Sequence, residues 1–182
     1  MSKASKIIVL CEDNAHAMFV RRFLKKWGVA NRKYTVLDYP NGEGSGKKFV
    51  KETLPKEVKA LRSRNASTIL LVVLDADEFS VDQVKYELDE IVVPHRGDEE
   101  QIAYIIPKWH IETWIAYLHG EDVDEEERQA YKTKYGKMAE LKSVHPFIDN
   151  LVSQCKNRVP LSFPPSSLIV TCGEFKRIRD ML

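Results

Sequence analysis

The chain has 182 residues, of which 30% are charged and 43% hydrophobic, and its formal net charge is +1 at pH 7. This length fits one globular domain that can bury its own core, and the composition excludes a disordered or a membrane protein. The longest apolar runs are strand-length, well short of the roughly 20 residues that span a bilayer, so we expect no membrane association.

The N-terminus lacks the pattern of a secretory signal, which predicts a cytoplasmic protein. Three cysteines, an odd number without any close pair in the sequence, predict reduced thiols instead of a disulfide framework or a zinc site. They are Cys11, Cys155 and Cys172.

Apolar runs of strand length alternate with segments of helical periodicity, the pattern of βαβ units around a mostly parallel sheet. In chain order, we expect a strand at 6–11, a helix at 15–27, a strand at 34–39, a helix at 47–62, a strand at 69–74, a helix at about 80–91 and a strand at 101–106. Three further helices are expected at 110–118, 145–157 and 166–182.

Local signals support several of these boundaries. Gly28 and Gly120 would end two of the helices, and Ser80 with Gln83 has capping-box spacing. The last helix would bury a stripe made of Leu168, Cys172, Phe175, Ile178 and Leu182.

The fold class that follows is α/β, with a central, mostly parallel sheet of about four strands, helices on both faces and additional C-terminal helices. Residues 1–120 would form the α/β core. Residues 121–182 would form a helical C-terminal extension that packs on the same domain.

A glycine-rich segment at 42–48 precedes the second expected helix. It resembles a P-loop only superficially, because Asn41 stands where the motif requires its first glycine and Lys48 where it requires a hydroxyl residue. We therefore interpret it as a mobile βα connection, although its backbone amides could cradle a phosphate.

The charges are clustered despite the small net charge, and a local basic patch could attract phosphate. The alternative for each cluster is a solvated helix face. An acidic run at 121–127 separates the second basic cluster from the preceding chain. The basic clusters are Arg21, Arg22, Lys25 and Lys26, and then Lys132, Lys134, Lys137 and Lys142.

Carboxylates follow two of the expected strands: Glu12 after the first, and Asp75 and Asp77 after the third. In an open α/β sheet, ligands bind beyond the carboxyl ends of the strands, so these acids would converge if the two strands are neighbours. Oxygen donors of this kind suit Mg²⁺, with Mn²⁺ as an alternative. Isolated aspartates at such positions also serve as ordinary helix caps and turn residues.

These positions resemble the TOPRIM domains of topoisomerases, bacterial primases, ribosomal-RNA maturases and overcoming-lysogenization-defect (OLD) nucleases, which place a glutamate after the first strand and Asp-x-Asp after the third. The segment Pro107–Trp114 is similar to the Pro-x-x-x-x-Glu-x-Trp segment of small standalone TOPRIM-like proteins of bacterial defence loci. Residues 164–175 are similar to their C-terminal helix. The resemblance implies a Rossmann-like TOPRIM fold.

The chain departs from the TOPRIM pattern in two places. Asp13 stands where many members have glycine, and His16 stands where OLD nucleases usually have a second acid. His16 could bind a metal or transfer a proton, or it could be a solvated histidine at a helix start.

The resemblance implies a Mg²⁺-dependent nuclease, a phosphodiesterase that acts on DNA or RNA in phage defence. Glu12, Asp75 and Asp77 would be catalytic residues and metal ligands, with Glu12 as a ligand or as the general base. Glu112 would be a further metal ligand, and Lys108 would neutralise charge on the scissile phosphate. Basic helix faces would contact the nucleic-acid backbone. An ATPase partner is implied, and a homo-oligomer is left open.

Two alternatives remain. The segment 8–14 also resembles the first strand and acidic pair of a response-regulator receiver domain, in which Asp75 would be the phosphorylated residue. The chain could instead be a degenerate TOPRIM interaction protein that contacts its partner through Trp109, Trp114 and Tyr117, although aromatic residues more commonly pack in the core.

Overall fold

A parallel four-stranded sheet forms the centre of the computed structural model, which describes residues 3–38, 45–64, 67–128, 130–136 and 142–182. The strand order is β2-β1-β3-β4, and every pairing is parallel. The strands are β1 (Lys6–Cys11), β2 (Tyr34–Asp38), β3 (Thr68–Val73) and β4 (Ile102–Ile105). The predicted α/β class and the sheet of four parallel strands are confirmed.

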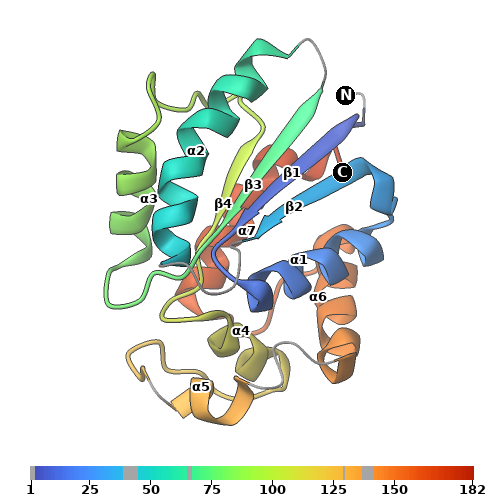
Figure 1. Ribbon diagram of the computed structural model, residues 1–182. Helices are drawn as coiled ribbons and strands as arrows, with labels where there is room; N and C mark the ends of the chain where they lie inside the picture. The colour runs from blue at the N-terminus through green and yellow to red at the C-terminus, as the bar shows by residue number, and fades with distance from the viewer. Residues whose placement is uncertain (1–2, 39–44, 65–66, 129, 137–141) are drawn as a thin grey trace.

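Helices cover both faces of this sheet (Figure 1). Side chains alternate along a strand, so Val9 of β1 faces one helical layer and Leu10 faces the other. Burial on both faces explains why the central strands are continuous apolar runs. One layer holds α2 (Gly46–Ser63) and α3 (Val81–Glu90); the other holds α1 (Asn14–Trp27), α4 (Ile111–Leu118), α6 (His145–Asn157) and α7 (Ser166–Arg179).

The predicted caps are present. Gly28 follows α1 with a left-handed φ of 102°, and Gly120 follows α4 with a φ of 90°. Ser80 and Gln83 form the reciprocal hydrogen bonds of a capping box at the start of α3.

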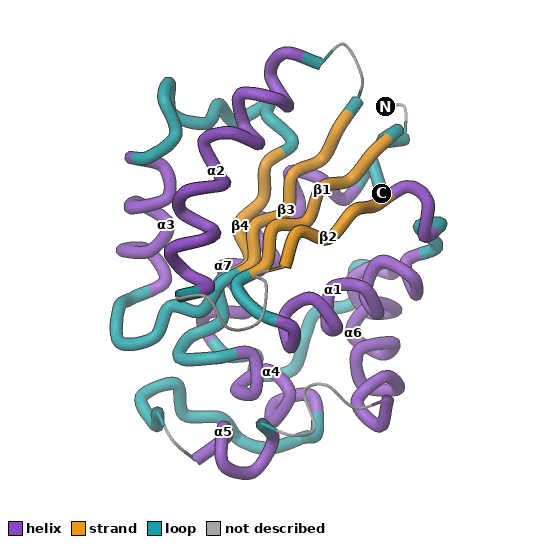
Figure 2. The backbone as a smooth tube through the Cα atoms, viewed as in Figure 1, coloured by secondary structure: helices purple, strands orange, loops and turns teal. Residues whose placement is uncertain are grey.

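The C-terminal elements pack against the core: α6 contacts α1, and α7 contacts β4. In Figure 2 the carboxyl ends of the four strands meet at the centre, with α4 and α5 (Ala130–Tyr135) below them. No helix of the described residues is long and apolar enough to cross a membrane.

Several details differ from the sequence expectations. Helix α7 ends at Arg179, three residues before the predicted end, and Cys172 of its expected buried stripe is only half-buried. Helix α5 and the 3₁₀ turns Asn31–Lys33 and Lys142–Val144 were not predicted, because such short elements have weak periodicity. Residues 42–44 of the glycine-rich segment, and Asn41 before it, lie outside the described residues.

Candidate metal centre

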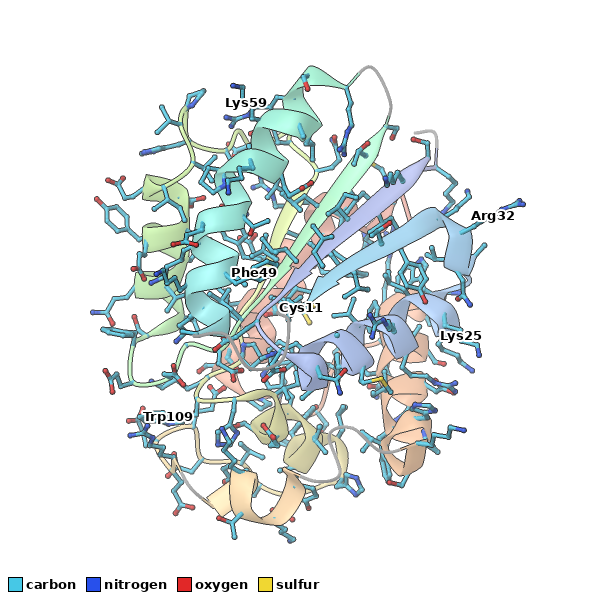
Figure 3. The ribbon with its side chains drawn as sticks, viewed as in Figure 1. Cys11, Lys25, Arg32, Phe49, Lys59 and Trp109 are labelled. Carbon is cyan, nitrogen blue, oxygen red and sulfur yellow. The ribbon has the colours of Figure 1, made fainter. Side chains whose placement is uncertain are left out.

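Glu12 and Asp75 meet at the carboxyl edge of the sheet. Strands β1 and β3 are neighbours, and Cys11 at the end of β1 is in register with Val73 at the end of β3 (Cys11 is labelled in Figure 3). The backbone N–H of Asp75 donates a 3.0 Å hydrogen bond to Oε2 of Glu12. The residues that follow two separate strands thus form one cluster, and Asp75 within it is only 8% exposed.

His16 connects this cluster to Asp13. Its Nε2 lies 2.8 Å from Oδ1 of Asp75, and its Nδ1 lies 2.8 Å from Oδ1 of Asp13. The side chain is completely buried, so the interpretation of His16 as a solvated histidine is wrong. The reason is that α1 starts two residues after Glu12, which places its first turn against the carboxyl end of β3.

Asp13 is the N-cap of α1, and its Oδ1 accepts a 2.9 Å hydrogen bond from the backbone N–H of His16. In the sequence, Asp13 stands out only as a departure from the TOPRIM pattern and as part of the acidic pair that resembles a receiver domain. A signal was nevertheless present, because an aspartate three residues before a histidine at a helix start has N-cap spacing.

The charge of His16 follows from these contacts. Burial opposes the charged imidazole, but the charge of Asp75 and the hydrogen bonds to Asp13 and Asp75 outweigh it and raise the pKa of His16 well above its ordinary value. Burial likewise opposes the charged form of Asp13, but the hydrogen bond and the charge of His16 lower the pKa of Asp13 to about 2. His16 is therefore an imidazolium held between two carboxylates.

Glu12 and Glu112 are buried acids whose pKa is shifted upward, in contrast to that of Asp13. Burial, followed by the negative charge of Asp75, raises the pKa of Glu12. Burial also raises the pKa of Glu112, and the charge of Asp75 adds to this effect. Glu112 lies in the first turn of α4, with Oε2 at 3.4 Å from Nδ1 of His110. The charge of Asp75 thus opposes the ionisation of both Glu12 and Glu112.

Asp77 lies at the rim, with its side chain about half exposed. Lys47 Nζ donates a 2.5 Å hydrogen bond to its Oδ2. Lys108 Nζ donates to the backbone carbonyls of Asp77 and Phe79, at 3.0 and 2.8 Å. The Asp77 carboxylate is therefore ion-paired with Lys47 and lies outside the group of ligand atoms described below. Lys108 holds the turn after β3 through the two backbone carbonyls. Glu78 is exposed, as expected.

The start of α2 approaches Glu12 very closely. A Cβ atom placed on Gly46 would lie 2.1 Å from the carbonyl oxygen of Glu12 and 2.8 Å from its Cγ. Only glycine fits this contact. The glycine-rich segment thus contributes close packing against the acidic cluster at Gly46 and the cation Lys47, neither of which the sequence analysis assigned to the site.

Some of the predicted basic and aromatic contact residues are used within the fold, whereas Lys25, Lys26, Lys132 and Lys142 are exposed. Arg22 binds Asp149 of α6 through both carboxylate oxygens, and Lys134 pairs with Glu121. Trp114 is buried in the core. Lys25 points outward from α1, as Figure 3 shows. Lys137 lies outside the described residues.

The donor set suits a divalent cation. One side-chain atom each from Asp13, His16 and Asp75 lie within 4.8 Å of one another, but His16 as an imidazolium has no free lone pair, so the carboxylates would be the ligands. Glu12 is hydrogen-bonded to Asp75, and carboxylate oxygens are the ligands that Mg²⁺ and Mn²⁺ prefer. Buried acids whose pKa is raised by burial and by a neighbouring carboxylate, as for Glu12 and Glu112, are also stabilised in their charged form by added positive charge. On both counts these residues fit a hard cation.

Comparison of the chain with protein-family models, with curated proteins and with solved structures gave no match. The TOPRIM resemblance, the receiver alternative and the interaction-protein alternative therefore stay predictions.

Proposed function

We propose that the protein is a divalent-cation-dependent phosphodiesterase that cleaves DNA or RNA. The observation that carries this proposal is the joining of Glu12 and the buried Asp75 at the carboxyl edge of neighbouring parallel strands. This edge is where open α/β sheets bind ligands. The TOPRIM resemblance supplies the reaction class.

Asp75 and Glu12 would hold Mg²⁺ or Mn²⁺, and Asp77 and Glu112 stand at the flanks as additional oxygen donors. When bound, the cation would orient a phosphate and stabilise the negative charge that develops during phosphodiester cleavage. A ring nitrogen binds a metal only without its proton. His16, protonated between two carboxylates, is therefore better suited to positioning than to ligation in this arrangement.

Glu12 has the properties of a general base. Its pKa is raised by burial and by Asp75, so it takes up a proton more readily than an ordinary glutamate. Its hydrogen bond from the N–H of Asp75 uses Oε2 and fixes the carboxylate. Glu12 would accept the proton of an attacking water, either in place of metal ligation or in addition to it.

His16 and Asp13 hold Asp75 in place. Because the helix cap, the imidazolium and Asp75 form one chain of hydrogen bonds, the first turn of α1 fixes the orientation of the Asp75 carboxylate. Lys47 and Lys108 place two positive charges beside Asp77, where they would attract a phosphate backbone without reading its sequence. An ATPase partner and a role in phage defence rest on the resemblance alone.

Asp75→Asn and Glu12→Gln test the proposal, with the exposed Glu78→Gln as the matched control. Purified proteins would be assayed on single-stranded and duplex DNA and RNA with Mg²⁺, Mn²⁺ or EDTA. Loss of partner groups around a metal ligand already costs about 10- to 100-fold, so we expect loss of a ligand to cost about 100-fold or more. Glu78→Gln should cleave like the wild type.

A folded Asp75→Asn protein with wild-type metal-dependent cleavage would refute the mechanism. Cleavage that appears only after a co-purified partner is added would favour the interaction-protein alternative. Circular dichroism of each variant separates loss of chemistry from loss of fold.

A further inference from the structure

The two C-terminal cysteines lie together far from the acidic cluster. Cys155 is on α6 and Cys172 on α7, and their thiol groups share a hydrogen bond. Both side chains are half-buried, whereas Cys11 is completely buried in the sheet. Two thiols from different helices that line the same groove and the same cavity are placed to form a bond once their sulfurs come together.

The surroundings give both sulfurs access and room. On one side, both cysteines line a groove of about 300 Å³ that includes Pro160, Leu161 and Lys176. On the other side, both line a small apolar cavity of about 40 Å³ between α1, α6 and α7. A small oxidant can reach the pair from the groove, and the cavity lets the sulfurs shift as they come together.

The two thiols differ in acidity. The hydrogen bond from Cys155, assisted by the charge of Lys176, outweighs burial and lowers the pKa of Cys172 to about 7. The same hydrogen bond, with burial, raises the pKa of Cys155. Cys172 therefore supplies a thiolate near neutral pH, and Cys155 supplies the proton that stabilises it.

We propose that Cys172 and Cys155 form a peroxide-sensitive pair that closes to a reversible disulfide between α7 and α6. The Cys172 thiolate attacks one oxygen of a hydroperoxide, the O–O bond breaks, and the other oxygen leaves as hydroxide or alkoxide. The sulfenic acid on Cys172 is then attacked by the sulfur of Cys155, whose proton goes to the departing hydroxide as water. In total, two thiols are oxidised and one peroxide is reduced.

The first experiment treats the full-length protein with hydrogen peroxide, blocks the remaining thiols and maps the products by mass spectrometry. We expect a Cys155–Cys172 disulfide that dithiothreitol reverses, with Cys11 still reduced. In Cys155→Ser the sulfenic acid should persist on Cys172 and react with dimedone. In Cys172→Ser, Cys155 should stay reduced, and Cys11→Ser should behave like the wild type.

The second experiment measures the rate of alkylation of Cys172 by iodoacetamide against pH. At pH 7, half of a thiol with a pKa of about 7 is ionised, against about 3% of one with a pKa of about 8.5. A thiolate of lower pKa is also a weaker nucleophile, which divides the gain in ionised fraction by about five. The alkylation rate of Cys172 should therefore be roughly threefold above that of an ordinary cysteine. The pH midpoint of the alkylation rate should rise in Cys155→Ala. It should stay closer to 7 in Cys155→Ser, because the serine hydroxyl can still donate a hydrogen bond to the Cys172 thiolate.

Oxidation of Cys11 as fast as of Cys172, disulfides only between molecules, or sulfenic acid on Cys155 instead of Cys172 would each overturn the proposal. An alkylation midpoint that is identical in the wild type and in Cys155→Ala would also overturn it. Circular dichroism of the variants before oxidation shows that each measurement concerns the folded protein.

Discussion

Asp77 combines an unusual backbone with an acidic side chain at the rim of the candidate site. Its φ is 51°, a left-handed conformation that aspartate, asparagine and glycine adopt more readily than other residues. Its carbonyl accepts a hydrogen bond from Lys108, and its carboxylate pairs with Lys47. The residue thus shapes the turn after β3 as well as carrying a charge, and these two roles can be separated.

Substitution of Asp77 by Asn, Gly or Ala separates the role of its backbone from the role of its charge. Asp77→Asn tolerates the left-handed backbone and loses only a half-exposed ion pair, so its free energy of unfolding should stay within about 1 kcal/mol of the wild type. Asp77→Ala should be less stable than Asp77→Gly by about 1 kcal/mol, because a Cβ atom is strained at this φ. Urea unfolding in EDTA measures both differences. Equal stability of the Ala and Gly variants would contradict a left-handed Asp77 in solution.

That Glu12 and Asp75 lie close together could be predicted from the sequence, because each follows an apolar run and the two strands are commonly adjacent in α/β sheets. The burial of His16 could not, since it depends on where the first turn of α1 lies relative to β3. The contact of Gly46 with Glu12 joins residues 34 positions apart and likewise leaves no local signal.

At the scale of elements, α7 is anchored by one buried glutamate. Glu174 receives hydrogen bonds from Arg96 and from the backbone N–H of Tyr104, and Lys85 Nζ lies 2.7 Å from its Oε1. Because β4 is an edge strand, the N–H of Tyr104 would otherwise be unpaired. Glu174 therefore completes the edge of the sheet and fixes α7 across it.

This anchor predicts a specific acid sensitivity. Burial opposes the charged form, but Arg96 and Lys85 outweigh it and lower the pKa of Glu174 to about 2 from the usual 4.5. A lowered pKa contributes stability that is present above about pH 4.5 and lost as the pH falls through about 2. The shift corresponds to about 3 kcal/mol, and about 2 kcal/mol of it should be lost by pH 3.

The measurement compares wild-type, Glu174→Gln and Glu52→Gln proteins by urea unfolding from pH 7 to pH 3. Glu52 is exposed on α2, so its variant should follow the wild type within about 0.5 kcal/mol at every pH. The stability gap between the wild type and Glu174→Gln should narrow as the pH falls. A gap that stays constant would show that Glu174 does not titrate as an ion-paired acid.

Most elements could be predicted from periodicity and caps, and α6 has the predicted bounds. The start of α7 has a less visible cause. Glu125 of the acidic run accepts hydrogen bonds from Ser166 and Ser167, which lie 41 and 42 residues further along the chain, and so caps the helix. From the sequence alone the acidic run is interpreted only as a separator of charge clusters, because a side-chain cap from a distant loop has no spacing rule.

At the scale of the whole molecule, the parallel sheet concentrates the chemistry at one edge. Helices α1 and α4 begin beyond the carboxyl ends of β1 and β4 and bring His16 and Glu112 with them, while α2 begins against Glu12 (Figure 1). The acids cluster there at an electrostatic cost that the fold must offset. A cation that binds only the folded chain would offset it further.

Added metal should therefore stabilise the whole protein through Asp75. At a free concentration ten times the dissociation constant, a bound cation adds about 1.4 kcal/mol, which raises the Tm of a chain of this size by roughly 3–6 °C. Differential scanning fluorimetry with Mn²⁺ or Mg²⁺ should show this rise for the wild type and for Glu78→Gln. The rise should be absent in Asp75→Asn, and EDTA should reverse it. An equal rise in the Tm of Asp75→Asn would mean that the stabilising cation binds elsewhere. No rise in the Tm of the wild type would mean that the positive charges of His16 and Lys47 alone offset the charges of the acids at this edge.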